Sequence, residues 1–218
     1  SNIIINASAG LPATPVATIT QPSCTVATGT ITITSPVGLG ITYSIDGTNY
    51  TNTTGVFAGL TPGIYTISAQ GAVGCIGNST SFVVNSQPVT PNTPTASVVN
   101  PTCSVATGTI TIVSPLGTGY TYSTDGTTYT NTNGIFTGVT SGNYSVTVKS
   151  AAGCISPVTS IVVNAQPATP IAPVVTTVQP SCTVATATIT VTSPTGTGFT
   201  YSSDGINYTN TTGVFANL

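Results

Sequence analysis

Residues 22–34 read PSCTVATGTITIT, and nearly the same stretch returns as PTCSVATGTITIV at 101–113 and as PSCTVATATITVT at 180–192. The three stretches are spaced by 79 residues, so the chain is an array of one repeated unit. Inside the stretch, threonine and isoleucine alternate strictly, which places isoleucine on one face of a β-strand and threonine on the other. The sequence therefore predicts an all-β repeat protein.

Each copy contains about seven short runs with strand character and no helical period. In the first copy we expect strands near Ala17–Thr20, Thr30–Thr34, Ile41–Ile45, Thr48–Thr51, Val56–Leu60, Gly63–Ala69 and Ser81–Asn85. Asp46-Gly47 lies between two of these runs, which predicts a hairpin with a type I′ turn. Seven strands in under 80 residues favour an immunoglobulin-like or fibronectin-III-like β-sandwich.

A tyrosine near the start of the sixth run supports the sandwich. Tyr65 follows Leu60-Thr61-Pro62-Gly63-Ile64, and Tyr144 follows a matching segment of the second copy. This arrangement is typical of the tyrosine corner, in which the phenol holds the preceding turn. A plain Pro-Gly turn followed by a core tyrosine predicts the same fold.

The period divides the chain into four segments. Ile3–Asn6 aligns with Phe82–Asn85, and Leu218 aligns with Leu60, so we expect a window cut from a longer array. Proline-rich linkers at 87–91 and 166–170 favour semi-rigid spacers and a rod-like arrangement of modules. The predicted segments are the last strand and linker of a preceding repeat at 1–16, two immunoglobulin-like repeats at 17–95 and 96–174, and a truncated repeat at 175–218.

Charged residues make up only 2% of the chain and there is no histidine. The full set is Asp46, Asp125, Asp204 and Lys149. General acid–base catalysis and activated nucleophiles need titratable groups near neutral pH, so we predict no enzyme, no catalytic residue and no cofactor. One lysine excludes nucleic-acid binding, and the longest apolar runs are far too short to insert in a membrane.

The same scarcity argues against metal sites. Calcium takes six to eight oxygen ligands and usually several carboxylates, whereas each copy offers one aspartate inside a turn. Zinc is excluded by the absence of histidine and of any CxxC pair. We therefore interpret the aspartates as turn residues.

Five cysteines occupy two repeating positions: Cys24, Cys103 and Cys182 at one, Cys75 and Cys154 at the other. Paired cysteines in a small, charge-poor β domain indicate an oxidising, extracellular setting. Our first expectation is pairing within a copy, Cys24 with Cys75 and Cys103 with Cys154, leaving Cys182 unpaired by truncation. The alternative pairs Cys24 with Cys154, because the first turn of one sandwich and the last hairpin turn of the next would face each other in a head-to-tail rod.

The combination of PSC, ATGTITIT, GYTYSTDGT, GNYSVTV and GC within one 79-residue period resembles the SprB-type repeat of giant cell-surface adhesins in gliding Bacteroidetes. The resemblance covers the whole chain and is most specific at 121–126 and at 142–148 leading to Gly153-Cys154. It implies export by type IX secretion and display on the bacterial cell surface. Family repeats often carry an acidic residue before the second Gly-Cys, which this chain lacks, so no metal role for that acid carries over.

The expected function is a structural stalk module of a long extracellular adhesive filament, involved in surface adhesion or gliding, without catalysis. Its expected partners are neighbouring repeats of the same chain, with other filament chains or surface glycans as further candidates. The alternative is a repeat-based glycan- or ice-binding module that uses the threonine rows. The structural explanation of those rows is that β-branched threonine suits the outer face of strands in a soluble protein with few charges.

Overall fold

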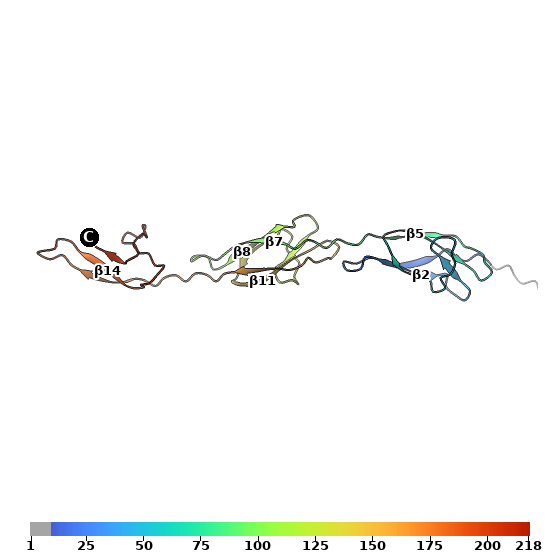
Figure 1. Ribbon diagram of the computed structural model, residues 1–218, viewed down its shortest axis with the longest axis horizontal. Helices are drawn as coiled ribbons and strands as arrows, with labels where there is room; N and C mark the ends of the chain where they lie inside the picture. Colours follow the sequence, from blue (N-terminus) through green and yellow to red (C-terminus); the bar gives the residue numbers. More distant parts are fainter. Residues whose placement is uncertain (1–9) are drawn as a thin grey trace, which may run out of the picture. The chain divides into compact units, whose positions relative to one another are not determined.

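The computed structural model describes residues 10–218. The strand expected at Ile3–Asn6 lies outside the described residues. Within residues 10–218 every regular element is a β-strand, and the strands form antiparallel three-stranded sheets (Figure 1). The all-β prediction is confirmed.

The first two copies contain the same six strands. In the first copy these are β1 (Val16–Thr20), β2 (Gly29–Ser35), β3 (Thr42–Ser44), β4 (Val56–Leu60), β5 (Gly63–Gln70) and β6 (Thr80–Val84). In the second copy they are β7 (Thr95–Val99), β8 (Gly108–Ser114), β9 (Thr121–Ser123), β10 (Ile135–Val139), β11 (Gly142–Lys149) and β12 (Thr159–Val163). The third copy has β13 (Val174–Val178), β14 (Thr188–Ser193) and β15 (Val214–Phe215) among the described residues.

Each complete set of six strands is a sandwich of two sheets. In the first copy the strand orders are β1-β2-β4 and β3-β5-β6, and in the second copy β10-β8-β7 and β12-β11-β9. This division of strands between two sheets is that of immunoglobulin-like and fibronectin-III-like domains. The third copy contributes the single sheet β13-β14-β15.

The alternating pattern of β2 builds the core as the sequence predicts. Ile31 and Ile33 are buried while the threonines between them lie toward the outer face. Burying one such side chain contributes about 1.5–3 kcal/mol. The first core consists of Ile31, Ile33, Tyr43, Ile67, Ala69 and Val84, and the second of Ile110, Ile112, Tyr122, Val146, Val148 and Val163.

By their contacts, the described residues form two compact units. One holds the chain up to Val99 together with Gly108–Val163, and therefore contains both complete sandwiches. The other holds the turn Asn100–Thr107 and the segment Asn164–Leu218.

The tyrosine corner is present in both complete copies. The Tyr65 hydroxyl donates to the carbonyl oxygen of Thr61 at 2.7 Å, and the Tyr144 hydroxyl donates to that of Thr140 at 2.8 Å. Each phenol thus ties the start of its strand to the preceding turn, as the sequence predicts.

The loop after β3 differs from the prediction. Thr48–Thr51 forms no strand, and the Asp46-Gly47 pair is not a type I′ turn. That turn needs positive φ at both central residues, and only Gly47, with φ of 74°, has it. The N–H of Thr48 donates to the Asp46 carboxylate at 2.8 Å, so a side-chain cap takes the place of the hairpin.

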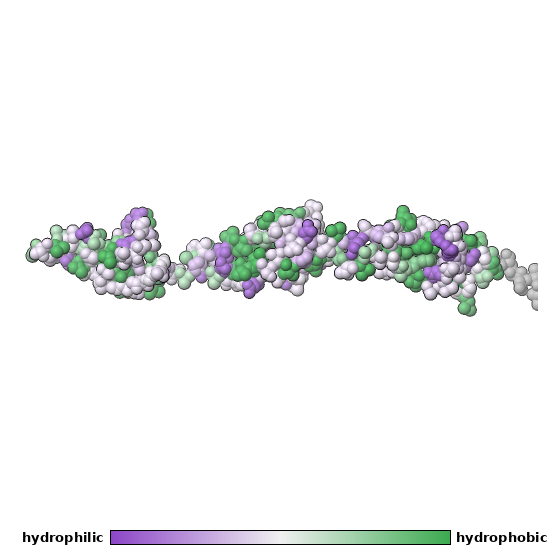
Figure 2. Space-filling view, in the orientation of Figure 1, coloured by the Kyte–Doolittle hydropathy of each residue, from purple (hydrophilic) through white to green (hydrophobic). Residues whose placement is uncertain are grey.

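The surface reflects the low charge of the chain. Figure 2 shows pale, weakly polar areas interrupted by green apolar patches, with little strongly hydrophilic surface. Large aliphatic side chains are scattered over it, among them the fully exposed Leu39 and the largely exposed Val89.

Candidate functional site: the junction between the first two copies

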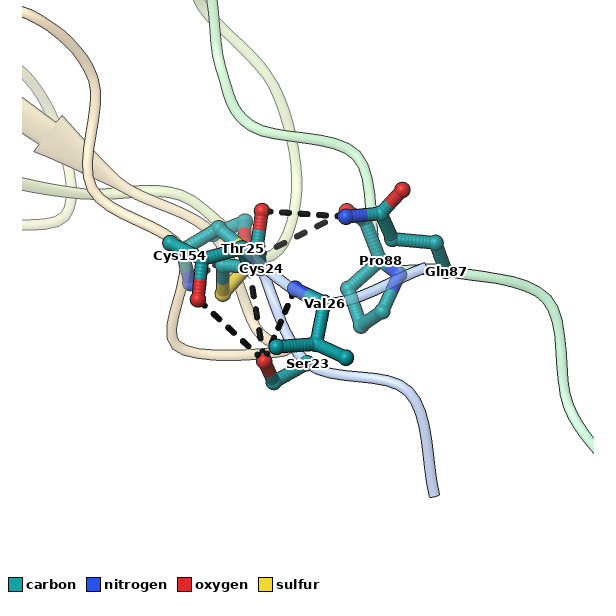
Figure 3. The surroundings of a disulfide bond; sticks show 8 residues. Ser23, Cys24, Thr25, Val26, Gln87, Pro88 and Cys154 are labelled. Carbon is teal, nitrogen blue, oxygen red and sulfur yellow. Dashed lines mark hydrogen bonds between the residues drawn. A yellow bond between two sulfur atoms is a disulfide. The ribbon is translucent and has the colours of Figure 1, made fainter. Parts of the chain in front are cut away.

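A disulfide bond joins the first copy to the second. Cys24 lies in the turn between β1 and β2, and Cys154 lies in the hairpin turn between β11 and β12 (Figure 3). Their sulfur atoms are 2.08 Å apart, their Cα atoms 5.4 Å apart, and the two residues are separated by 130 positions in sequence. The bond belongs to one compact unit.

This bond corrects the pairing that the sequence favoured. Neither Cys24 with Cys75 nor Cys103 with Cys154 is bonded, and the pairing between neighbouring copies is the one formed. The reason is the position of the two turns. Cys24 and Cys75 lie in turns at opposite ends of the β5–β6 hairpin, whose longer strand spans about 23 Å at about 3.3 Å per residue. A disulfide requires Cα atoms within about 7 Å.

Hydrogen bonds fix the Cys24 turn at the end of the sandwich where β6 ends. The side chain of Gln21 brackets that end, donating to the carbonyl of Val83 at 2.9 Å and accepting from the N–H of Asn85 at 2.8 Å. The side-chain amide of Gln87, in the linker, donates to the carbonyl of Cys24 at 3.2 Å. The first turn and the outgoing linker are therefore held together.

The Cys154 hairpin has its own internal order. The N–H of Ser150 donates to the carbonyl of Cys154 at 2.9 Å, and the N–H of Gly153 donates to the carbonyl of Ser150 at 2.9 Å. Gly153 has φ of 88°, a left-handed conformation that glycine adopts without steric cost. Two residues further on, Ser156 is buried and its hydroxyl accepts from the N–H of Val148 at 3.0 Å.

The linker docks on this hairpin. Cys154 is only 1% exposed, and its sulfur lies 3.9 Å from the carbonyl oxygen of Pro88. Pro91 and Pro94 are buried, and the hydroxyl of Thr159 donates to the carbonyl of Pro94. The linker is thus clamped against the second copy, and the disulfide lies beside it (Figure 3).

The linker between the second and third copies provides a contrast. Pro170 and Pro173 are the counterparts of Pro91 and Pro94, and both are exposed. Sequence reasoning treated the prolines only as spacers. Their recurrence with a glutamine in each linker was the signal for a docked junction, but it does not show what they dock on.

The three other cysteines are free thiols in the structure. Cys75 is half-buried, and Cys103 and Cys182 are exposed. The prediction that Cys182 is unpaired agrees with this state, whereas Cys75 and Cys103 were expected to be bonded.

The aspartates act as loop caps. In the first copy, one oxygen of Asp46 accepts from the Ser44 hydroxyl at 2.7 Å and from the N–H groups of Thr48 and Asn49 at 2.8 Å each. The N–H of Asn49, then the Ser44 hydroxyl and the N–H of Thr48, hold the pKa of Asp46 far below its usual range. Asp125 and Asp204 have the same surroundings in their copies, and their pKa values are lowered for the same reason.

These carboxylates do not gather into a metal site. Within residues 10–218, no three histidine, cysteine, aspartate or glutamate side chains lie close enough together to hold an ion. The single cation, Lys149, is half-buried with its Nζ 5.3 Å from the centroid of the Tyr129 ring, a cation–π contact that the sequence did not predict. No helix in the described part of the chain is long and apolar enough to cross a membrane.

The third copy carries an apolar groove of about 600 Å³. Ile189, Val191 and Phe215 of its single sheet line the groove, together with Tyr201. The equivalent faces of the first two copies are covered by β5–β6 and β11–β12.

The fold and this junction define a class of protein: tandem immunoglobulin-like or fibronectin-III-like β-sandwich modules with a covalent bond between consecutive copies. No protein-family model and no curated protein matches the sequence.

Several solved structures share the general fold. The C-terminal 282-residue fragment of intimin, solved in complex with the intimin-binding domain of the translocated intimin receptor, matches 70% of this chain with a TM-score of 0.41 and 16% identity. The FN1–FN3 domains of chicken CNTN1 match 71% with a TM-score of 0.36 and 14% identity, and domains 7, 8 and 9 of the S-layer protein SbsC match 72% with a TM-score of 0.28 and 15% identity. The matched regions span 64%, 66% and 64% of those chains, respectively.

Proposed function

We propose that this chain is a structural stalk module of an extracellular adhesive filament of the SprB type, and that the disulfide between copies limits how far the stalk stretches under load. The observation that carries the proposal is the placement of the Cys24–Cys154 bond. Ten strands, β2 to β11, lie in the covalent loop between the two cysteines. Only β1 and β12 of the first two copies lie outside it.

This placement sets the path of a pulling force. Tension applied to the two ends of the chain reaches Cys24 through β1, crosses the disulfide to Cys154, and continues through β12. The residues between the two cysteines stay slack, because the bond holds their Cα atoms 5.4 Å apart. Even if both sandwiches unfolded, these residues would add no length to the chain.

The cell compartment follows from the chemistry of the bond. Disulfides persist in oxidising surroundings and are rare in the cytosol, which supports an extracellular location. The surface of weakly polar side chains, with four charged residues in the whole chain, suits a passive stalk. Display on a bacterial surface, type IX secretion and a part in gliding rest on the sequence resemblance.

The alternative, a glycan- or ice-binding face of threonine, finds less support. In the first copy Thr18 pairs with Thr32 and Thr20 pairs with Thr30 across β1 and β2. The second copy has Val99 in place of Thr20. A repeat-based binding face needs the same row in every copy, and this row is interrupted by valine.

Stretching single molecules of the full chain, with and without reductant, tests the proposal. Reduction should release 130 residues that the oxidised chain withholds, a gain of about 430–470 Å at about 3.3–3.6 Å per residue. Equal contour lengths in the two conditions would remove the mechanical role. Specific binding of the chain on a glycan array would favour the alternative function instead.

A further inference from the structure

The five cysteines fall into two structural classes. Cys24, Cys103 and Cys182, here called the first-turn cysteines, occupy the turn after the first strand of their copies. Cys75 and Cys154, here called the hairpin cysteines, occupy the turn after the long fifth strand. The observed bond joins a first-turn cysteine to a hairpin cysteine of the next copy at a separation of 130. No other pair of cysteines in this sequence has that separation, which explains why three thiols are free.

The free first-turn cysteine Cys103 lies in the same local structure as the bonded Cys24. In the Cys24 turn, the N–H of Val26 donates to the hydroxyl of Ser23 at 3.2 Å, and in the Cys103 turn the equivalent bond is also 3.2 Å. The carbonyl of Cys103 accepts from the Gln166 amide at 3.1 Å, as the carbonyl of Cys24 accepts from a linker glutamine at 3.2 Å. The turn is therefore built for the bond without the partner being present.

The free hairpin cysteine Cys75 is prepared in the same way. The N–H of Gly71 donates to its carbonyl at 2.9 Å, the same distance as in the Cys154 hairpin. Gly74 has φ of 86°, against 88° for Gly153. The two hairpins therefore present their cysteines on equivalent backbones.

The linker that enters the first copy is also docked. Pro15 is fully buried, as is its counterpart Pro94 in the bonded junction. The carbonyl oxygen of Pro12 lies so close to Gly77 that a Cβ there would be 2.3 Å away. The hairpin that carries Cys75 thus already holds its own half of a junction, as the Cys154 hairpin does.

We propose that Cys75, Cys103 and Cys182 are half-sites for covalent docking of a second copy of this chain, and that each accepts only a cysteine of the other class. A hairpin cysteine of one chain bonds to a first-turn cysteine of another. Each bond joins two thiol sulfurs, and the two protons and two electrons pass to oxidised glutathione, which leaves as two molecules of reduced glutathione. The inference rests on the junction geometry and holds whatever surface the chain adheres to.

The test uses the full chain with its Cys24–Cys154 bond formed, incubated at high concentration with oxidised glutathione. We expect covalent dimers and longer oligomers on non-reducing gels, with peptide mapping showing Cys75 bonded to Cys103 or Cys182. The variant Cys75→Ser removes the one free hairpin cysteine, so we expect at least a tenfold loss of covalent oligomers. The matched single variant Cys103→Ser should still form them through Cys182.

Random oxidation of exposed thiols predicts the opposite ranking. Cys103 and Cys182 are more exposed than Cys75, so random chemistry would join first-turn cysteines to each other and would continue in Cys75→Ser. That outcome, or the absence of covalent oligomers in the wild type, overturns the proposal. Circular dichroism and mapping of the Cys24–Cys154 bond verify that each variant is folded.

Discussion

Cys24 and Cys154 join the turn beside which the linker leaves the first sandwich to the hairpin on which the linker docks in the second. The two copies are therefore connected twice, once through the peptide chain and once through sulfur. Because the linker is clamped beside the bond, the junction is a built structure in which both connections support the same contact.

Removing the bond should destabilise the first two copies together. In the chain-entropy model, a closed loop of 130 residues stabilises the folded state by about 5 kcal/mol relative to the open chain. We expect the variant Cys24→Ser to lower the unfolding free energy by up to about that amount, measured by chemical denaturation without reductant. The double variant with Cys154→Ser should be no less stable than either single variant, because one bond is lost in every case.

The control for this experiment is Cys182→Ser, which removes an exposed free thiol. Its denaturation curve should overlay that of the wild type. Equal stability of Cys24→Ser and Cys182→Ser would contradict the structural role of the bond.

The tyrosine corner gives a second prediction. Tyr65→Phe keeps the ring and removes the hydroxyl that donates to Thr61, leaving that carbonyl with one partner fewer. We expect a loss of about 0.5–1.5 kcal/mol in the stability of the first copy. Tyr208→Phe, at a side chain that is 58% exposed, is the matched control and should change little. Comparable losses in the two variants would mean that the corner bond adds nothing.

Gly29 marks a close approach between the two sheets of the first copy. A Cβ at this position would lie 2.7 Å from a γ-methyl of Val84 and 3.0 Å from the carbonyl oxygen of Thr20. Because valine has one stiff torsion and the carbonyl belongs to the backbone, neither yields easily. We expect Gly29→Ala to cost about 1–3 kcal/mol by thermal or chemical denaturation.

The third copy supplies the comparison, since it carries Ala187 where the first has Gly29. Ala187→Gly removes a methyl from that position and should cost no more than about 1 kcal/mol. A Gly29→Ala variant as stable as the wild type would show that the sheets separate without penalty.

Much of the fold could be predicted because its signals are local. Alternation in Gly29–Ser35 gives a strand with one buried face, and the spacing of Tyr65 from its turn gives the corner. The disulfide could not be assigned in the same way. Spacing treats Cys75 and Cys154 as equivalent partners for Cys24, and only the opposite positions of the turns in the folded sandwich separate them.

The turn at Asp46 shows a second limit. Asp-Gly between two alternating runs favours a hairpin when only the backbone is considered. Here the carboxylate collects the N–H groups of Thr48 and Asn49 and the hydroxyl of Ser44, and this local network outweighs strand pairing. Side-chain caps of this kind depend on several neighbours at once, so a dipeptide signal does not reveal them.

Alkaline pH should destabilise the fold through two core tyrosines. Burial raises the pKa of Tyr43 and of Tyr122 above the ordinary value of 10.0. The neutral phenols therefore contribute stability that is fully present below pH 10 and is lost as pH rises through their raised values. Melting temperatures should stay constant up to about pH 9 and fall beyond pH 10, and a constant value up to pH 12 would contradict the burial of these rings.

Acid should act through the three aspartates. Hydrogen bonds from backbone N–H groups and from a serine hydroxyl lower the pKa of Asp46, Asp125 and Asp204 below the ordinary value of 3.8. A depressed pKa contributes stability that is fully present above the ordinary value and is lost as pH falls from there toward the folded-state value. We therefore expect melting temperatures that are constant from about pH 5 to 9 and decline below pH 4. The triple variant D46N/D125N/D204N keeps the side-chain shape without the charge, so its melting temperature should be lower at pH 7 and should not decline further in acid. A wild-type melting temperature that stays constant down to pH 2 would show that the capped carboxylates do not stabilise these loops.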